Sequence, residues 1–466
     1  MKNSPVTPLP EELIALGNER WQEIQSHEQF SAHFESFEKQ IKTAFALSDF
    51  IFEQCLKNPL WLVELLLEKV LFTEQVDYQD NLVQLLAQVD SEAVLQQKLR
   101  QFRNFHMLRI AWRDLLNMQS IEDSLAQVSD LARQLITQTN SWLYQFLQPQ
   151  FGLPEGELGP QPMLILGMGK LGGDELNFSS DIDLIFTYPA QGVTSGGRKS
   201  IEHQQFFTKV AQKLITALDQ ITADGQVYRV DMRLRPFGDS GPLVMHFDAM
   251  EDYYQEQGRD WERYAMLKAS ILNAPCPYTQ QLLAILQPFI YRRYLDFSAI
   301  ESLRSMKSMI EQEVRRRGLA EFVVQSLQLI NGGREPSLKV QSLQLALSEL
   351  VNLQILPAQS AKDLLQSYLW LRKIEHCLQQ FADKQTQVLP NNDTDQKRLL
   401  TVLGINDYED FMQQLAQHCG LIHQQFSLLV KDDPALLDDV ADEQLQGAKD
   451  LWQLQLNAEE TQSILN

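Results

Sequence analysis

Cysteine is scarce in this chain: four residues among 466, with no C-x-x-C pair and no cluster with histidine. A disulfide framework or a zinc site needs closely spaced cysteines, so the sequence predicts neither. We expect Cys55, Cys276, Cys377 and Cys419 to be reduced thiols within the core. A chain of this length can bury sizeable cores without crosslinks and has room for roughly two to four domains.

Long apolar runs are also missing. The richest one, PLWLVELLLEKVLF, is interrupted by Glu64, Glu68 and Lys69, and the opening MKNSPVTPLPEELIALGNERW contains no apolar signal segment. These absences predict a soluble, cytoplasmic protein with no membrane partner.

Positive charge is in deficit, with 40 lysines and arginines against 61 acidic residues and a formal net charge of −21. A long phosphate backbone would be repelled on average, so we expect no nucleic-acid partner. A small nucleotide held through a metal ion is compatible with this charge, because the cation reverses the local sign.

Helical periodicity dominates, and the sequence predicts a mostly α fold with one α/β module. The Gly- and Pro-rich stretch 151–162 marks a linker. The expected order is an N-terminal helical region (1–150), the module (151–275), a C-terminal helical bundle (276–430) and an acidic tail (431–466).

Two helical segments are specific enough to test. In LRQFRNFHMLRIAWRDLL (99–116), Phe102, Phe105, Leu108 and Trp112 lie toward one side for core packing, with the arginines on the others. The chain after the module's strands, DAMEDYYQEQGRDWERYAMLKASIL (248–272), is expected to be helical throughout.

The stretch LILGMGKLGGDELNFSSDIDLIF (164–186) fits the dinucleotide-binding pattern G-x-G-x-x-G, starting at Gly167. That fingerprint requires a helix after the turn, whereas only Asp174 to Ser180 separate the glycines from a second strand-like run, and we expect no helix there. The Walker A pattern fails too, because Gly173 stands where lysine is needed. The glycines therefore predict a turn that admits nucleotide phosphates, without a Rossmann fold.

The second strand-like run, DIDLIF, places two carboxylates side by side. Side chains alternate along a strand, so Asp181 and Asp183 share one face while Ile182, Leu184 and Phe186 point into a core. At ~5 to 7 Å the repulsion costs on the order of a few kcal/mol, which a shared divalent cation would reverse.

A third carboxylate comes from VYRVDMRLRP (227–236), which also alternates and is expected to be a strand. If it pairs beside the first strand, Asp231 completes a cluster suited to two Mg²⁺ or Mn²⁺ ions, and Arg233 and Arg235 can grip phosphate oxygens. A solvated edge with ordinary ion pairs is the alternative. A glycine turn, D-x-D and a third aspartate together are the arrangement of nucleotidyltransferases resembling DNA polymerase β. Lys170, the turn's only cation, either meets a phosphate or is solvated.

Longer motifs carry a family resemblance. GMGKLGGDELNFSSDIDLIF, YRVDMRLRPFGDSGPLV and EDYYQEQGRDWERYAMLKA closely resemble the bacterial glutamine synthetase adenylyltransferase/adenylyl-removing enzymes. The likeness continues through LSDFIFEQCLKNPLWL, LRQFRNFHMLRIAWRDLL and QLINGGREPSL, so it covers most of the chain. That family carries two nucleotidyltransferase halves in tandem, and this chain is long enough for one. ELNFSSDIDLIF with RPFGDSGPLV is similar to the N-terminal half, which removes AMP from a tyrosine of glutamine synthetase.

The resemblance implies a reaction and its partners. Inorganic phosphate attacks the tyrosyl-AMP phosphorus of adenylylated glutamine synthetase, giving ADP and the unmodified enzyme. The PII signal protein in its uridylylated form would stimulate this reaction, and glutamine would oppose it.

The same resemblance implies a set of site residues. The metal ligands would be Asp181, Asp183 and Asp231, and the nucleotide and phosphate pocket would be shaped by Gly169, Lys170, Gly172, Gly173 and Ser180, with Arg233 and Arg235 as phosphate contacts. Glu262 and Arg263 would support the site from the following helix, and Trp261 and Tyr264 would pack.

Two other functions stay open: AMP transfer from ATP onto glutamine synthetase, and a non-catalytic binding module for PII or glutamine synthetase. One departure from the family also stands out. RRRGL (315–319) runs directly into AEFVVQSLQLI (320–330), whereas relatives carry a Gly-rich segment at the Leu319–Ala320 junction. A deletion there would put that loop's part in substrate or phosphate binding in doubt and would leave the aspartates intact.

Overall fold

The structure is a computed structural model that describes residues 8–26, 32–291, 319–386 and 388–429. The Arg-rich segment before Leu319 and the acidic tail lie outside these residues. From residue 8 to residue 151 every described regular element is helical. These elements are α1 (Glu11–Gln25), η1 (Ala32–Phe37), α2 (Glu38–Leu47), α3 (Asp49–Lys57), α4 (Leu60–Leu62), η2 (Val63–Leu67), η3 (Val70–Phe72), α5 (Tyr78–Leu86), α6 (Glu92–Leu115) and α7 (Ile121–Phe151).

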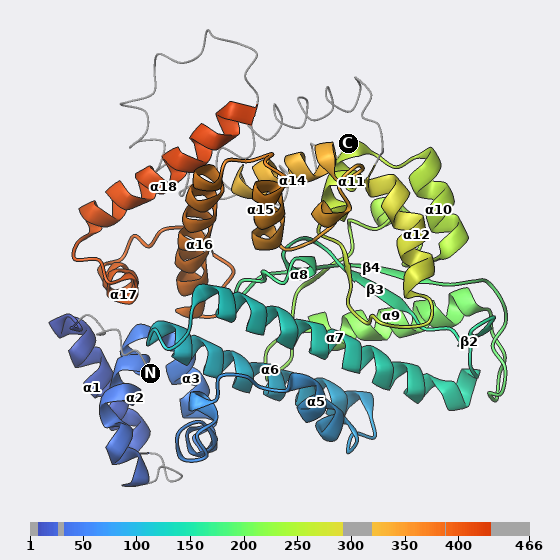
Figure 1. The fold of residues 1–466 in the computed structure, drawn as a ribbon. Helices are drawn as coiled ribbons and strands as arrows, with labels where there is room; N and C mark the ends of the chain where they lie inside the picture. The colour runs from blue at the N-terminus through green and yellow to red at the C-terminus, as the bar shows by residue number, and fades with distance from the viewer. Residues whose placement is uncertain (1–7, 27–31, 292–318, 387, 430–466) are drawn as a thin grey trace.

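A small mixed sheet follows these helices, so the expectation of a mostly α fold with one α/β module is confirmed (Figure 1). Within the described residues its strand order is β5-β4-β3-β7, and β6 also pairs with β4. β3 is antiparallel to both β4 and β7, whereas β5 and β6 run parallel to β4. The strands are β3 (Leu164–Gly167), β4 (Ile182–Tyr188), β5 (Val230–Asp231), β6 (Val244–His246) and β7 (Ser270–Ile271), and a separate hairpin joins β1 (Glu155–Gly156) to β2 (Gly159–Pro160).

Helices cover both faces of the sheet because both faces of its central strands are apolar. Ile182, Leu184 and Phe186 of β4 pack into the core shared with α6, α7 and α9 (His203–Asp219), as their alternation predicted. Ile185 points the other way, into a second core with α10 (Phe247–Glu256), α11 (Asp260–Met266) and α12 (Thr279–Ile290). The sheet is therefore the middle of three layers (Figure 1).

Two strand and helix expectations need correction. The run 227–236 is a strand only at Val230 and Asp231, because the chain turns at 233–237 and the one-turn helix η4 (Gly238–Ser240) follows. The stretch 248–272 is not one helix: it breaks between α10 and α11 and ends in β7, which pairs with β3.

The C-terminal helices form a third core, built from residues of α14, α15, α16 and α18. Helix α16 also reaches the first core, where Ile374, Leu378 and Phe381 are buried beside α6 and α7. The C-terminal helices are therefore packed directly against the helices under the sheet. The described elements of this region are α14 (Leu319–Asn331), η5 (Pro336–Leu338), α15 (Leu343–Asn352), α16 (Ala358–Gln380), α17 (Asp393–Leu403) and α18 (Tyr408–Leu429).

All four cysteines are free thiols, as expected. Cys55 and Cys377 are buried, whereas Cys276 and Cys419 are only partly buried, so the expectation of core thiols holds fully for two of them. Among the described helices, none has the length and apolar character needed to cross a membrane.

Candidate active site

The glycine motif forms a tight connection between β3 and β4. The one-turn helix α8 (Gly169–Gly172) begins at the turn, so the expectation of no helix is wrong for that turn. The exclusion of a Rossmann unit holds, because β3 and β4 are antiparallel and no crossover helix joins them. A Cβ on Gly172 would lie 1.8 Å from the Lys268 carbonyl oxygen. Glycine is therefore required there by close packing.

Gly169 brings the turn close to Asp183. Its φ is +53°, in the left-handed region, and a Cβ on it would lie 3.6 Å from Asp183 Oδ2. The Met168 N–H also donates to the Asp183 carbonyl at 2.9 Å. The absence of a side chain at Gly169 thus leaves backbone directly beside the Asp183 carboxylate.

Asp183 and Asp231 are directly opposite each other on neighbouring parallel strands, in the register Asp183↔Asp231. The pairing anticipated from the sequence is therefore present, although β5 is short. Asp219 Oδ1, at the end of α9, accepts the Val230 N–H at 3.0 Å and fixes the position of β5.

Asp181 precedes β4 and is held by side chains from other parts of the chain. Arg229 donates to Asp181 Oδ1 and, at 2.7 Å, to the Ser179 carbonyl. Gln385 donates to Asp181 Oδ2 at 3.1 Å. Its carboxylate is thus shared between an arginine of the site and an amide from the chain after α16.

Asp231 is paired with the arginine that follows it. Arg233 donates through its main-chain N–H at 2.8 Å to Oδ1, and through Nε and NH2 at 2.8 and 2.5 Å to Oδ2. Arg235 contacts the Met232 carbonyl and Asp239. Beside these groups is an open hollow of about 410 Å³, whose walls are Asp181, Arg229, Val230, Asp231, Met232, Arg233 and Asp239.

The electrostatics of the two facing aspartates differ. Burial, with the negative charges of Asp231 and Asp181, raises the pKa of Asp183 from 3.8 to about 6. Burial also opposes ionisation of Asp231, but the hydrogen bonds and charge of Arg233 outweigh it and lower the pKa of that carboxyl. Asp183 is therefore the group whose ionised form most needs a cation.

The donor set fits a hard divalent cation, because Mg²⁺ and Mn²⁺ take carboxylate oxygens and Asp183 faces Asp231 in register. In the described ranges no three His, Cys, Asp or Glu side chains are already grouped closely enough to hold a metal ion. Two of the three aspartates are instead paired with arginines, Asp181 with Arg229 and Asp231 with Arg233. Metal ligation by all three aspartates stays a prediction that requires those ion pairs to open.

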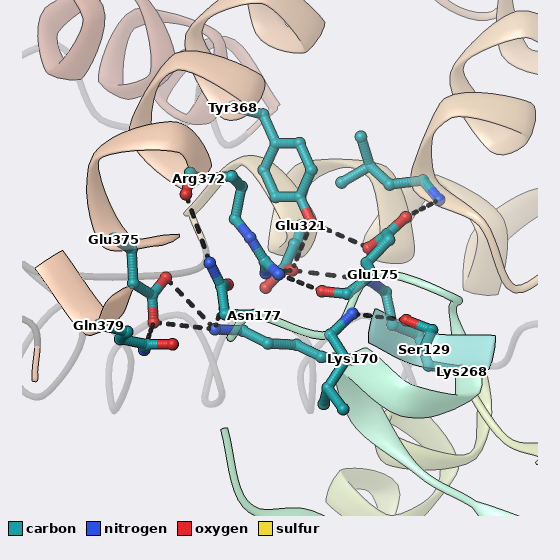
Figure 2. Close-up of polar contacts among 12 residues, drawn as sticks. Ser129, Lys170, Glu175, Asn177, Lys268, Glu321, Tyr368, Arg372, Glu375 and Gln379 are labelled. Atoms are coloured by element: carbon teal, nitrogen blue, oxygen red, sulfur yellow. Dashed lines mark hydrogen bonds and ion pairs between the residues drawn. The ribbon is translucent and has the colours of Figure 1, made fainter. Parts of the chain in front are cut away.

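The turn residues that were expected to shape the nucleotide pocket, Lys170, Gly173 and Ser180, have different surroundings. Lys170 is only partly buried, and its ammonium is paired with α16: its Nζ lies 3.2 Å from Glu375 Oε1 and 3.5 Å from Asn177 Oδ1 (Figure 2). Burial, followed by the charge of Arg372, lowers the pKa of Lys170. A Cβ on Gly173 would lie 3.3 Å from the Gln341 carbonyl oxygen, and Ser180 is partly buried immediately before Asp181.

The DWERY residues support the fold rather than touching the aspartates. Glu262 accepts from Tyr253 OH at 2.7 Å and from the Arg259 N–H at 2.8 Å. Arg263 donates to the Phe289 carbonyl at 3.0 Å. The packing expected of Trp261 and Tyr264 is confirmed, since both lie against the third core.

Sequence reasoning missed a set of buried polar residues behind the turn. Glu175 accepts from Lys268 Nζ at 2.5 Å, from the Leu343 N–H at 2.7 Å and from Tyr368 OH at 2.8 Å (Figure 2). Arg372 donates to the Glu175 carbonyl. The only signal in the sequence was the polar content of GDELN, because the partners lie far away along the chain.

The fold and site define a mostly helical protein with an acidic site at one edge of a small mixed sheet. The sequence profile of the glutamate-ammonia ligase adenylyltransferase family matches residues 38–284, more than half of the chain. The chain belongs to this family. A second profile, that of GlnD PII-uridylyltransferase, matches residues 304–430.

Individual relatives agree with this assignment. The protein of Shewanella loihica is 45% identical over 100% of this chain and 50% of its own length. The protein of Shewanella frigidimarina is 49% identical over 84% of this chain and 43% of its own length. The protein of Psychromonas ingrahamii is 46% identical over 92% of this chain and 46% of its own length. Each is named a bifunctional glutamine synthetase adenylyltransferase/adenylyl-removing enzyme. The chain spans about half the length of the curated relatives it matches.

Proposed function

We propose that this chain removes AMP from the adenylylated tyrosine of glutamine synthetase, with inorganic phosphate as co-substrate and ADP as product. The observation that carries the proposal is the register of Asp183 against Asp231 beside the Gly169 turn. The names of the relatives support adenylyl chemistry on glutamine synthetase. The resemblance of ELNFSSDIDLIF and RPFGDSGPLV to the adenylyl-removing half favours removal over transfer.

In the proposed reaction an oxygen of inorganic phosphate forms a bond to the phosphorus of the AMP group. The bond from that phosphorus to the tyrosine oxygen breaks, its electron pair stays on that oxygen, and the oxygen takes the proton that the attacking hydrogen phosphate gives up. Phosphate and AMP leave together as ADP, so atoms and charges balance. Two Mg²⁺ or Mn²⁺ ions bound to Asp181, Asp183 and Asp231 would supply charge neutralisation at the attacking and leaving oxygens.

The chain's own residues have distinct parts in this scheme. Asp183 and Asp231 are presented from paired strands, so their separation is set by the backbone. Arg233 and Arg235 have forked donors that would pass from Asp231 and Asp239 to phosphate oxygens. Gly169 leaves space for a phosphate to approach the turn. We infer from these parts a core resembling DNA polymerase β, supported by the D-x-D at the start of β4 and the third aspartate beside it.

The profile match of residues 304–430 supports a PII signal protein as the regulator. We propose that the uridylylated form stimulates removal and that glutamine opposes it.

The test uses adenylylated glutamine synthetase incubated with this chain, phosphate and Mg²⁺ or Mn²⁺, with and without uridylylated PII. Loss of AMP with matching release of ADP is the expected result. In a parallel incubation of unmodified glutamine synthetase with ATP, AMP gained from ATP would instead indicate transfer. Binding with no turnover in either incubation, under any activator condition, would leave only a binding module.

The variants Asp183→Asn and Asp231→Asn should abolish ADP release. Asp248→Asn is the matched control, because Asp248 is an exposed carboxylate in the first turn of α10, outside the hollow. Unchanged turnover in both site variants would remove the metal mechanism.

A further inference from the structure

One side of α16 and the turn that follows it contact the loop between β3 and β4. Asn177 Nδ2 donates to the Arg372 carbonyl at 3.3 Å, and the Ser179 N–H donates to Gln379 Oε1 at 2.7 Å. The Ser179 hydroxyl donates to Asp383 Oδ1 at 3.1 Å. Together with the Lys170–Glu375 ion pair, these contacts follow the loop from the glycine turn to the residues just before Asp181.

The spacing of the α16 partners shows that they form one continuous edge. Positions 372, 375 and 379 are three and four residues apart, which places them on one face of a helix. Figure 2 shows Glu375 beside Lys170 and the Arg372 main-chain carbonyl beside Asn177, whereas the Arg372 side chain extends toward Glu175. The loop therefore lies along a polar face of a helix whose apolar residues pack in the first and third cores.

The end of α16 is itself fixed by the N-terminal helices. Arg103 of α6 binds Asp383 with two donors, at 2.5 and 3.1 Å. At the start of α3, the N–H groups of Asp49 and Phe50 donate to the Phe381 carbonyl at 2.8 and 3.1 Å. The turn after α16 thus has partners on two separate helices.

Asp383 occupies a backbone conformation that is unfavourable for most residues. Its φ is +47°, in the left-handed region, which aspartate tolerates better than other non-glycine residues. Strain of this kind, on the order of 1–3 kcal/mol, persists where surrounding contacts over-determine it. Here those contacts are the bidentate Arg103 and the Ser179 hydroxyl.

We propose that Asp383 is a positioning residue for the active site. Through Asp383, the C-terminal helices complete that site. Asp183 and Asp231 are held by strand pairing, but Asp181 lies outside the ladder, directly after the segment that Asp383 holds through Ser179. Gln385, two residues beyond Asp383, then orients the Asp181 carboxylate by donating to Oδ2, while Arg229 donates to Oδ1. This inference rests on the proposed reaction at the three aspartates.

The experiment compares Asp383→Gly, Asp383→Asn and a control in full-length protein. Glycine removes the carboxylate without adding strain at a positive φ, and asparagine keeps an oxygen acceptor for Ser179 while losing the charge that pairs with Arg103. Asp49→Asn is the control, because Asp49 also joins two arginines, Arg20 and Arg398, at 2.6 Å each, and its side chain does not contact the loop.

We expect Asp383→Gly to lower kcat by about 10- to 100-fold, since ~1 Å of misplacement can cost ~100-fold. It should also raise the Mn²⁺ concentration for half-maximal activity while KM for adenylylated glutamine synthetase stays within about twofold. Asp383→Asn should recover part of kcat, and Asp49→Asn should match the wild type in both quantities. Wild-type kcat and Mn²⁺ dependence in Asp383→Gly would overturn the proposal, as would an equal loss in Asp49→Asn.

A separate readout distinguishes this inference from the proposed function. If the wild-type chain releases no ADP, the proposed function fails, and amide hydrogen exchange of the peptide covering residues 170–183 then decides the positioning role. Faster exchange there in Asp383→Gly, with exchange in α17 unchanged, supports the inference. Wild-type exchange in that peptide overturns it.

Discussion

Replacing Asp183 by asparagine should stabilise the folded protein while abolishing turnover. The pKa of Asp183 rises from 3.8 to about 6 through burial and the charges of Asp231 and Asp181. At about 1.4 kcal/mol per pH unit, this corresponds to ~3 kcal/mol of lost stability at neutral pH. Coulomb's law gives a similar figure, because two carboxylates ~5 Å apart repel by ~3 kcal/mol at an effective dielectric of about 20.

The measurable gain is smaller than this, because Asp183 is only partly buried and water screens part of the repulsion. We expect Asp183→Asn to unfold at a higher urea concentration at pH 7.5, with a gain of ~1 to 2 kcal/mol. The sign of the pH dependence follows from the raised pKa. The destabilisation caused by ionised Asp183 is fully present above its folded pKa of about 6 and disappears as pH falls toward the unfolded value of 3.8. The stabilities of the wild type and Asp183→Asn should therefore converge near pH 4.

Divalent cations give the complementary measurement. Mg²⁺ or Mn²⁺ at about 100 times its dissociation constant should stabilise the wild type by ~2.7 kcal/mol and should stabilise Asp183→Asn much less. A variant that is less stable than the wild type at pH 7.5, by an amount independent of pH, would refute the repulsive pairing of Asp183 with Asp231. Equal stabilisation of both proteins by the cation would place metal binding elsewhere.

Three further substitutions follow from packing and buried charge, each read by urea unfolding. Gly172→Ala should cost several kcal/mol, because its Cβ would lie 1.8 Å from the Lys268 carbonyl, whereas Gly420→Ala, with open space around it in α18, should gain up to ~1 kcal/mol. Glu321→Gln should cost ~3 kcal/mol at pH 7. Burial opposes ionisation of Glu321, but the neighbouring cations outweigh burial and lower the pKa of Glu321 to about 2. The stability that the ionised carboxylate contributes is therefore lost as pH falls from about 4.5 to 2. Arg100→Met should cost ~2 kcal/mol or more, because Arg100 is fully buried and donates to backbone carbonyls of α9 and the loop after it. Equal stability of Gly172→Ala and Gly420→Ala, a Glu321→Gln loss that is the same at pH 3, or a neutral Arg100→Met would each contradict its prediction.

The elements that the sequence predicted well are those whose signal is local. Alternation in DIDLIF placed Ile182, Leu184 and Phe186 in one core because a strand's period of two is written in adjacent residues. The short distance between the glycine turn and that run excluded a crossover helix for the same reason. The predicted length of β5 was wrong because Pro236 and the turn around Phe237, whose φ is +63°, end the pairing that the alternation suggested.

The supports of the site could not be predicted, because their partners are distant in the chain. Ser179 meets Gln379 and Asp383, which lie 200 and 204 residues away. The arginines of α6 gave no sign of their burial, since four arginines at helical spacing usually lie on a solvated face. They are buried because the carbonyls and carboxylates of α9, the loops and the α16 turn converge on them.

The charged contacts behind the glycine turn act more on position than on net stability. Breaking a buried ion pair costs ~3 to 5 kcal/mol, yet replacing a whole buried network by apolar groups is often neutral or stabilising, so stability alone does not explain such a network. An apolar contact between α16 and the loop would tolerate sliding, whereas these hydrogen bonds are satisfied in one register. The network is balanced, with three cations and three anions: Lys170, Lys268 and Arg372 against Glu175, Glu321 and Glu375. We infer that this balance fixes the register of α16 against the loop that leads to Asp181, and that removing any one member leaves an uncompensated, at least partly buried charge next to the candidate active site.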